Sequence, residues 1–279
     1  MGLLNWTLPV AGLLWLSGGF AAAAAGLAET VPGHPGLTYF DLMKLVITDL
    51  APATAGGATG ETIVPLTHIE GKDAGTEMPE TVGIDSVEIM PIPGDAARII
   101  VLADVGRAEG YVAEVELLAL FALTPAAKLL DVVEVGNDRW TGFAEKKPVL
   151  LAPGSPLIMI YSGHSNSNQS YQSTEMIFVR DSRFRLIDSI LTFNERYCLF
   201  QRTQEPIVST LPDRGPYRAV HAVVRETTKL SGEDCGDEKA PRPGLTTYQA
   251  TYRWDARRQV FVASSRQLSK LAAENIKRF

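Results

Sequence analysis

The sequence predicts a mainly β protein: an antiparallel meander of hairpins that forms a sandwich or a barrel-like sheet, with a short helix near each end of the mature chain. From about residue 84 onward, apolar and polar residues alternate in short runs, as in strands that bury one face. Tight polar turns separate the runs, and helical spacing occurs in only two segments. Because similar hairpins also build propeller blades, a propeller is the alternative architecture.

The first element in chain order is a helix, predicted over residues 39–49. Thr38 and Asp41 have the spacing of a capping box, and Leu37 and Leu42 have the spacing of a hydrophobic staple. The apolar residues that follow recur at helical spacing on one face, and the helix is expected to stop before the next proline.

A long surface loop is predicted over residues 51–83. This segment is rich in Gly, Ala and Thr, and it holds at most one short strand, at residues 62–68. Loops of this length are uncommon inside compact domains and are often functional.

The rest of the chain is predicted to form short strands and a closing helix at residues 265–277. Three hairpins share a tight turn with Asp or Pro followed by a basic residue, but their spacing is unequal, so we expect no fixed repeat. The strands are expected at 87–89, 99–105, 115–123, 129–135, 157–161, 176–179, 184–193, 217–225, 247–254 and 260–263.

Residues 1–28 contain no Asp, Glu, Lys or Arg and predict a secretory signal peptide or an N-terminal membrane anchor. Small residues permit cleavage after Ala25 or after Ala28. A signal peptide usually begins with a basic residue, which this segment lacks, so a retained anchor is the alternative. Residues 29–279 are expected to form a single exported β-rich domain, periplasmic or secreted.

The net charge of −6 gives no support for nucleic-acid binding, which needs a basic face. No glycine-rich phosphate-binding motif occurs, and no cofactor is predicted. The four histidines lack zinc-ligand spacing, and the acidic residues at 233–238 lack the order of a calcium loop, so no metal site is predicted. Membrane contact is expected only if the N-terminal segment is retained.

Two cysteines, Cys198 and Cys235, lie in the exported part. An even number of cysteines in an oxidising compartment favours a disulfide between them. On the chain-entropy model, such a bond would stabilise the fold by roughly 4 kcal/mol at most. Two free thiols are the alternative.

The most distinctive polar segment is residues 161–171, which follows an apolar strand and has no Asp, Glu, Lys or Arg. Its amides, hydroxyls and imidazole can donate and accept hydrogen bonds, and its tyrosines can stack on a sugar face. The candidate binding residues are Tyr161, His164, Asn166, Asn168, Gln169 and Tyr171. The alternative is structural, because Asn and Ser in turns commonly bond their own backbone.

No catalytic residue is assigned from the sequence. Residues 163–167 come close to the nucleophile elbow Gly-x-Ser-x-Gly, but Ser167 stands where that sharp turn needs a second glycine. Asp131 and Asp188, each in an otherwise apolar strand, are candidates for acid–base chemistry if their side chains are buried.

These observations predict an exported cell-envelope protein that acts as a non-enzymatic binding module for a glycan, a peptide or a protein partner. A periplasmic hydrolase whose catalytic residues come from separate strands is the first alternative. A secreted enzyme inhibitor is the second.

Overall fold

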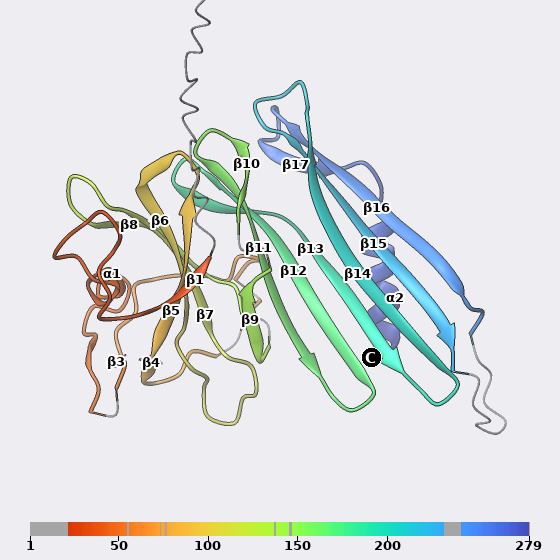
Figure 1. Cartoon of the computed structure of the whole chain (residues 1–279), viewed down its shortest axis with the longest axis horizontal. Helices are drawn as coiled ribbons and strands as arrows, with labels where there is room; N and C mark the ends of the chain where they lie inside the picture. The colour runs from red at the N-terminus through yellow and green to blue at the C-terminus, as the bar shows by residue number, and fades with distance from the viewer. Residues whose placement is uncertain are drawn as a thin grey trace, which may run out of the picture.

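A computed structural model describes residues 22–278, except residues 55, 73, 76, 137, 145–146 and 232–240. In this part of the chain the strands pair antiparallel into three sheets, and two short helices lie outside them (Figure 1). The mainly β class and the sandwich-like antiparallel meander predicted from the sequence are confirmed.

The first sheet has five strands in the order β1-β5-β6-β7-β8. They are β1 (Ala23–Gly26), β5 (Ser86–Ile92), β6 (Asp95–Asp104), β7 (Glu116–Ala122) and β8 (Lys128–Glu134). Residues 99–103 are apolar and buried at every position, because both faces of this sheet are covered. One face packs beneath helix α1 (Tyr39–Met43), and the other packs against the second sheet.

Helix α1 begins where the sequence predicts but ends earlier. The Thr38 side chain accepts a hydrogen bond from the Asp41 N–H, and the Asp41 carboxylate accepts one from the Thr38 N–H, so the capping box is confirmed. The predicted extent to residue 49 is wrong, because beyond Met43 the backbone pairs with a distant segment. The Thr48 N–H, for example, donates to the Thr62 carbonyl at 2.9 Å.

Segment 51–83 is more structured than the predicted loop. Three short strands form a small sheet whose buried residues join the core beneath α1. They are β2 (Ala51–Pro52), β3 (Ala58–Gly60) and β4 (Val82–Ile84). The strand predicted at 62–68 is wrong, since only isolated bridges at Ile63 and His68 occur there.

The second sheet runs in the order β10-β11-β12-β13-β14-β15-β16-β17, and β9 also pairs with β11. Its strands are β9 (Trp140–Phe143), β10 (Val149–Ala152), β11 (Ser155–Ser165), β12 (Gln169–Arg180), β13 (Arg183–Arg196), β14 (Phe200–Leu211), β15 (Ala219–Leu230), β16 (Gly244–Asp255) and β17 (Val260–Ala263). Many are longer than predicted, because the strands continue into polar residues beyond their apolar runs.

Strands β11–β13 lie between two apolar cores. One face packs on the first sheet. The other face packs on β15, β16, β17 and helix α2 (Gln267–Arg278). Strand β13 pairs with β14 only at Glu195 and Arg196, so the sheet opens between these strands and its last part folds back across β11–β13.

Helix α2 closes the second core and lies close to the predicted range 265–277. Its Leu268 and Leu271 are buried in that core. Its buried Asn275 exchanges hydrogen bonds with the Gln204 amide of β14 and donates to the Leu191 carbonyl of β13. The helix therefore fills the opening between β13 and β14.

Two sequence predictions reach outside the described residues. Residues 1–21 of the predicted leader lie outside them, whereas residues 23–26 form β1. Cys235 also lies outside, so the bridge to Cys198 remains a prediction. Among the helices of the described part, none is long and apolar enough to cross a bilayer.

Candidate functional site

A polar cluster lies at the end of the second sheet where β11 turns into β12, and β9 runs alongside (Figure 1). The strand register places Trp140 opposite Gly163 and His164 opposite Tyr171. A side chain could not replace Gly163, because its Cβ would lie 2.6 Å from the Tyr171 carbonyl oxygen. The close strand pairing thus brings the aromatic side chains to one place.

The buried carboxylate of Asp138 organises the cluster. Its Oδ1 lies 3.2 Å from His164 Nδ1 and accepts a hydrogen bond from the Arg139 N–H at 2.7 Å. Its Oδ2 accepts a hydrogen bond from the Tyr171 hydroxyl. The backbone N–H of Asp138 donates to the hydroxyl of Ser162, at 2.9 Å, which fixes the carboxylate against β11.

This arrangement sets the chemistry of His164. In the tautomer that carries its hydrogen on Nδ1, His164 donates to Asp138, and Nε2 is then a hydrogen-bond acceptor. Both oxygens of Asp138 are already engaged within the protein. Asp138 therefore holds the imidazole in place and is not itself presented to a ligand.

The side chains of Trp140, His164 and Tyr171 form a row that we call the aromatic ledge. The ring centroids of Trp140 and His164 are 6.0 Å apart, and those of His164 and Tyr171 are 6.3 Å apart and nearly parallel. Trp140 is 52% exposed, which is unusual for so large an apolar side chain. The ledge offers flat aromatic surface to solvent next to a polar ring nitrogen.

The conformation of the β11–β12 turn is stabilised mainly by hydrogen bonds between its own residues. The Asn166 side chain accepts hydrogen bonds from the N–H groups of Asn168 and Gln169, at 3.0 and 2.9 Å. The Gln169 amide donates to the Tyr197 hydroxyl of the neighbouring turn at 2.9 Å. Asn166 thus has the structural role that the sequence left as the alternative.

A hollow of about 210 Å³ lies between this turn and the β13–β14 turn. Asn166, Asn168 and Gln169 line it on one side, and Glu195 and Arg202 line it on the other. Glu195 and Arg202 form an ion pair, and Arg196 also lines the hollow, so its walls are polar and carry one further positive charge. Besides the ledge, this hollow is the second place where residues of the predicted binding segment line an open surface.

The structure thus brings together His164 and Tyr171 at the ledge, and the amides at the neighbouring hollow. Tyr161 lies elsewhere: its ring covers Gly142, where a Cβ would lie 3.0 Å from the tyrosine hydroxyl. Asp138 and Trp140 were not predicted from the sequence, because the first precedes and the second begins β9, a short strand with no alternating pattern. Their contacts with His164 span 26 and 24 residues of chain.

The carboxylates predicted for acid–base chemistry have structural partners. Asp131 accepts hydrogen bonds from Arg183 and from the Phe184 N–H, both at 2.7 Å. Asp188 accepts one from the Tyr252 hydroxyl at 2.6 Å. Each carboxylate joins two strands of the fold, and neither belongs to the ledge.

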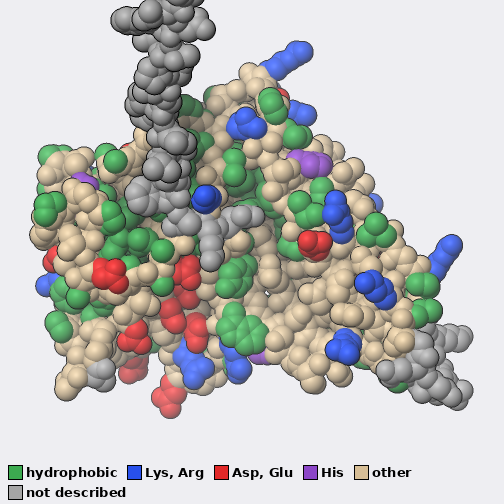
Figure 2. All heavy atoms as spheres, viewed as in Figure 1, with side chains coloured by type: hydrophobic (Ala, Val, Ile, Leu, Met, Phe, Trp, Pro, Cys, Tyr) green, Lys and Arg blue, Asp and Glu red, His purple; other side chains and the backbone are tan. Residues whose placement is uncertain are grey.

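Charged side chains of both signs lie near the ledge. Figure 2 shows acidic side chains gathered at the lower left of the view, with basic ones beside them. The Glu88 carboxylate lies 3.5 Å from the N–H of Phe143, on the strand that also carries Trp140. Burial, and after it the charges of Asp104, Glu114 and Glu88, raises the pKa of Glu116 to about 9. The charges of Arg107 and Arg139 act on Glu114 in the same cluster, and a protonated Glu116 adds no negative charge, so charges of both signs surround the ledge.

Within the described residues, no group of three or more His, Cys, Asp or Glu side chains is arranged to hold a metal ion. Comparison of the chain with protein-family models, with curated proteins and with solved structures returns no match. The positions and contacts of the site residues are therefore the basis for proposing a function.

Proposed function

We propose that the protein is an exported cell-envelope protein that binds a neutral glycan at the aromatic ledge without chemically changing it. One observation carries the proposal. An exposed Trp140 ring lies beside the His164 ring, and the buried Asp138 carboxylate fixes that imidazole. The uncharged N-terminal segment supports the export part of the proposal.

The chemistry of a sugar matches this surface. A pyranose ring has a face of C–H groups, which packs on a flat aromatic side chain, and a rim of hydroxyls, which bond to polar groups beside it. Trp140 supplies the flat surface, and His164 Nε2 supplies the polar group.

A hydrolase is the second candidate, because a histidine oriented by a carboxylate is also the arrangement of a general base. The nearest serine gives this candidate little support. Ser162 is fully buried, and its hydroxyl accepts bonds from the Asp138 N–H and the Thr141 hydroxyl. A hydrolase would therefore need water as its nucleophile at an open surface.

The test is an array of neutral envelope-type oligosaccharides, with acetylated peptides as a second panel, followed by calorimetry with the best binder. We expect oligosaccharide binding that Trp140→Ala weakens at least about tenfold, which corresponds to ~1.4 kcal/mol. The matched control is Leu245→Ala, since Leu245 is also apolar and is 66% exposed on β16.

Equal affinities for the two variants would contradict the proposal, as would binding of the peptides alone. Release of reducing ends from the bound oligosaccharide would favour the hydrolase instead.

A further inference from the structure

Five of the turns at the end of the molecule opposite the aromatic ledge form a surface that we call the turn end; it lies at the top of Figure 1. The turns are residues 93–94, 153–154, 181–182, 212–218 and 256–259. Strand β11 runs from this end to the ledge, and its 11 residues span about 35 Å. The two ends are therefore well separated.

Aromatic and cationic contacts hold the turns together. The rings of Tyr217 and Trp254 are 4.8 Å apart, and the Arg180 guanidinium lies 5.0 Å from the centre of the Trp254 ring. Arg180 also donates to the Gln259 carbonyl at 3.4 Å. These contacts join the turns at 181–182, 212–218 and 256–259 to one another.

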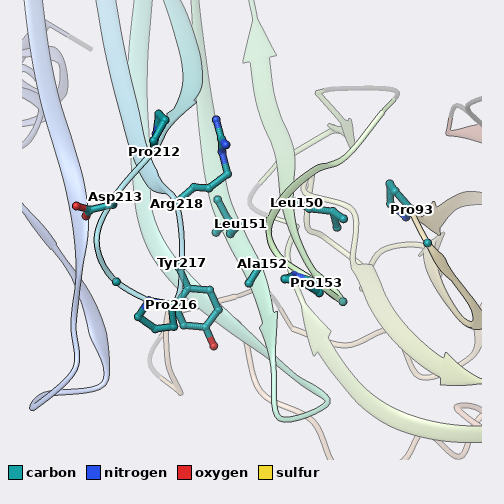
Figure 3. Close-up of a pocket in the computed structure, with 13 residues that line it drawn as sticks. Pro93, Leu150, Leu151, Ala152, Pro153, Pro212, Asp213, Pro216, Tyr217 and Arg218 are labelled. Atoms are coloured by element: carbon teal, nitrogen blue, oxygen red, sulfur yellow. The ribbon is translucent and has the colours of Figure 1, made fainter.

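An apolar hollow of about 570 Å³ opens at the turn end (Figure 3). Its walls come from residues 93–94, 150–154 and 212–218 and consist largely of proline, leucine and glycine. Figure 3 shows Pro216 and Tyr217 of one loop on the side opposite Pro153 of another. Such a surface can take up part of an apolar chain or of an interfacial lipid region.

Further apolar side chains at this end are exposed. Leu211, at the end of β14, is 39% exposed, and Val260, at the start of β17, is 42% exposed. Leu211 borders the loop at 212–218, which lines the hollow, and Val260 borders the turn at 256–259. The apolar character therefore extends beyond the hollow itself.

Arginines surround this apolar surface. Segments 180–183, 212–218 and 255–259 together hold six arginines and three aspartates, with no lysine or glutamate. Figure 2 shows basic side chains projecting at the top of the molecule. The turn end therefore has an excess of positive charge.

The three aspartates are engaged within the protein. Asp181 pairs with Arg180 at 3.2 Å, and Asp213 pairs with Arg253 at 2.8 Å. Asp255 accepts hydrogen bonds from the N–H groups of residues 257 and 258. The three carboxylates therefore already have bonding partners within the protein.

Three of the arginines remain available. Arg214, Arg257 and Arg258 are exposed, and no ion pair among the described residues includes them. Exposed guanidinium groups beside an apolar surface bind phosphate and carboxylate headgroups well. They are the groups that a test should remove.

The polypeptide also enters the fold at this end. Ala23, the first residue of β1, pairs with Ile89 of β5, the strand that leads into the turn at 93–94. The uncharged segment of the sequence precedes β1 directly.

From these observations we infer that the turn end docks on a bilayer surface that contains anionic lipids. The arginines contact the headgroups, and the apolar rim enters the boundary with the acyl chains. This inference goes beyond the proposed ligand site, which lies at the opposite end and would face away from the bilayer. It predicts membrane contact even without a retained anchor.

The test is flotation of the full exported chain with phosphatidylcholine vesicles and with vesicles of phosphatidylcholine and phosphatidylglycerol at about 7:3. We expect binding only to the anionic vesicles, and weaker binding as salt rises. The triple variant Arg214→Gln, Arg257→Gln, Arg258→Gln should lose about a hundredfold in partition coefficient.

A triple variant with the same charge change elsewhere is the matched control: Arg225→Gln, Lys229→Gln, Lys270→Gln, all at exposed positions. It should bind within about threefold of the wild type. If the first triple variant fails to fold, the single variant Arg258→Gln should still lose about fivefold.

The inference is wrong if both triple variants bind like the wild type, since the leader would then account for vesicle binding. It is also wrong if both lose affinity equally, if neutral vesicles bind as well as anionic ones, or if a soluble heparin fragment binds while vesicles do not.

Discussion

Glu116 is a carboxyl group buried against other carboxyl groups. It is 5% exposed, and its neighbours Asp104, Glu114 and Glu88 are acidic. Burial disfavours the charged form, and the neighbouring charges add to this effect, so the side chain is protonated in the folded protein at neutral pH. A residue of this kind makes stability depend on pH in a predictable direction.

The free energy of unfolding should fall as pH rises from about 4.5 to 9. The folded state keeps the Glu116 proton up to a pKa of about 9, whereas the unfolded chain releases it near its ordinary pKa of 4.5. The stability from this protonated group is complete below the lower value and is lost as pH approaches the upper one. Urea unfolding at several pH values measures it.

Glu116→Gln cannot ionise and should therefore gain stability relative to the wild type as pH rises. The gain should be at most about 1.4 kcal/mol per pH unit within this window. Glu205→Gln, at an exposed position on β14, is the control and should leave the pH dependence unchanged. Parallel pH profiles of Glu116→Gln and wild type would contradict the account.

The sequence could predict part of the site at this scale. His164 and Tyr171 were found because a tight hairpin pairs them directly. Tyr161 and His164 are three positions apart, and alternation along a strand puts such residues on opposite faces. Asp138 and Trp140 could not be found, because only tertiary pairing of β9 with β11 brings them there.

At the scale of single elements, the packing of β1 limits where an N-terminal leader could be cleaved. Its Ala25 is buried, and the Gly26 N–H donates to the Glu29 carboxylate at 2.7 Å. Cleavage after Ala25 or Ala28 would remove most or all of this strand from the first sheet. If the chain is exported as proposed, the packing of β1 therefore favours a mature form that keeps this strand.

We expect the exported protein to begin no later than Ala22. Gly19 and Ala21 also provide small residues at the −3 and −1 positions of a cleavage site. N-terminal sequencing, or the intact mass of the protein recovered after export, measures this. A mature chain that begins at Gly26 or Glu29 would contradict the packing of β1.

Helix α2 depends on one buried side chain. Asn275 is 1% exposed, and its replacement by Ala would leave the Gln204 amide and the Leu191 carbonyl without these bonds in the interior. We expect Asn275→Ala to lower the free energy of unfolding by about 2–4 kcal/mol. Chemical denaturation measures the change.

The next residue provides the control. Ile276 is 67% exposed, so Ile276→Ala should change stability by no more than about 0.5 kcal/mol. Similar losses for the two variants would contradict a specific role of the buried amide network, since alanine has the higher helix propensity at both positions.

The long strands could be predicted from alternation, but segment 39–83 could not. The cap at Thr38 is a local signal and was found. The end of α1 depends on pairing between residues near 48 and 62, which are far apart in the sequence. The strands β2, β3 and β4 are only two or three residues long, too short for a periodic pattern.

At the scale of the whole molecule, charge is unevenly distributed along the chain. Residues 1–138 contain 18 acidic and 5 basic residues, whereas residues 139–279 contain 14 acidic and 21 basic ones. The first sheet is built from the acidic part and the second sheet from the basic part. The net charge of −6 conceals this asymmetry, which orients the molecule in an electric field such as that of an anionic surface.

The measurement that tests the central claim most directly is hydrogen–deuterium exchange with and without the neutral oligosaccharide selected on the array. The account predicts slower exchange in residues 138–143 and 161–172, and unchanged exchange in the turn end. Saturable binding with protection confined to other segments would contradict the assignment of the aromatic ledge as the ligand site.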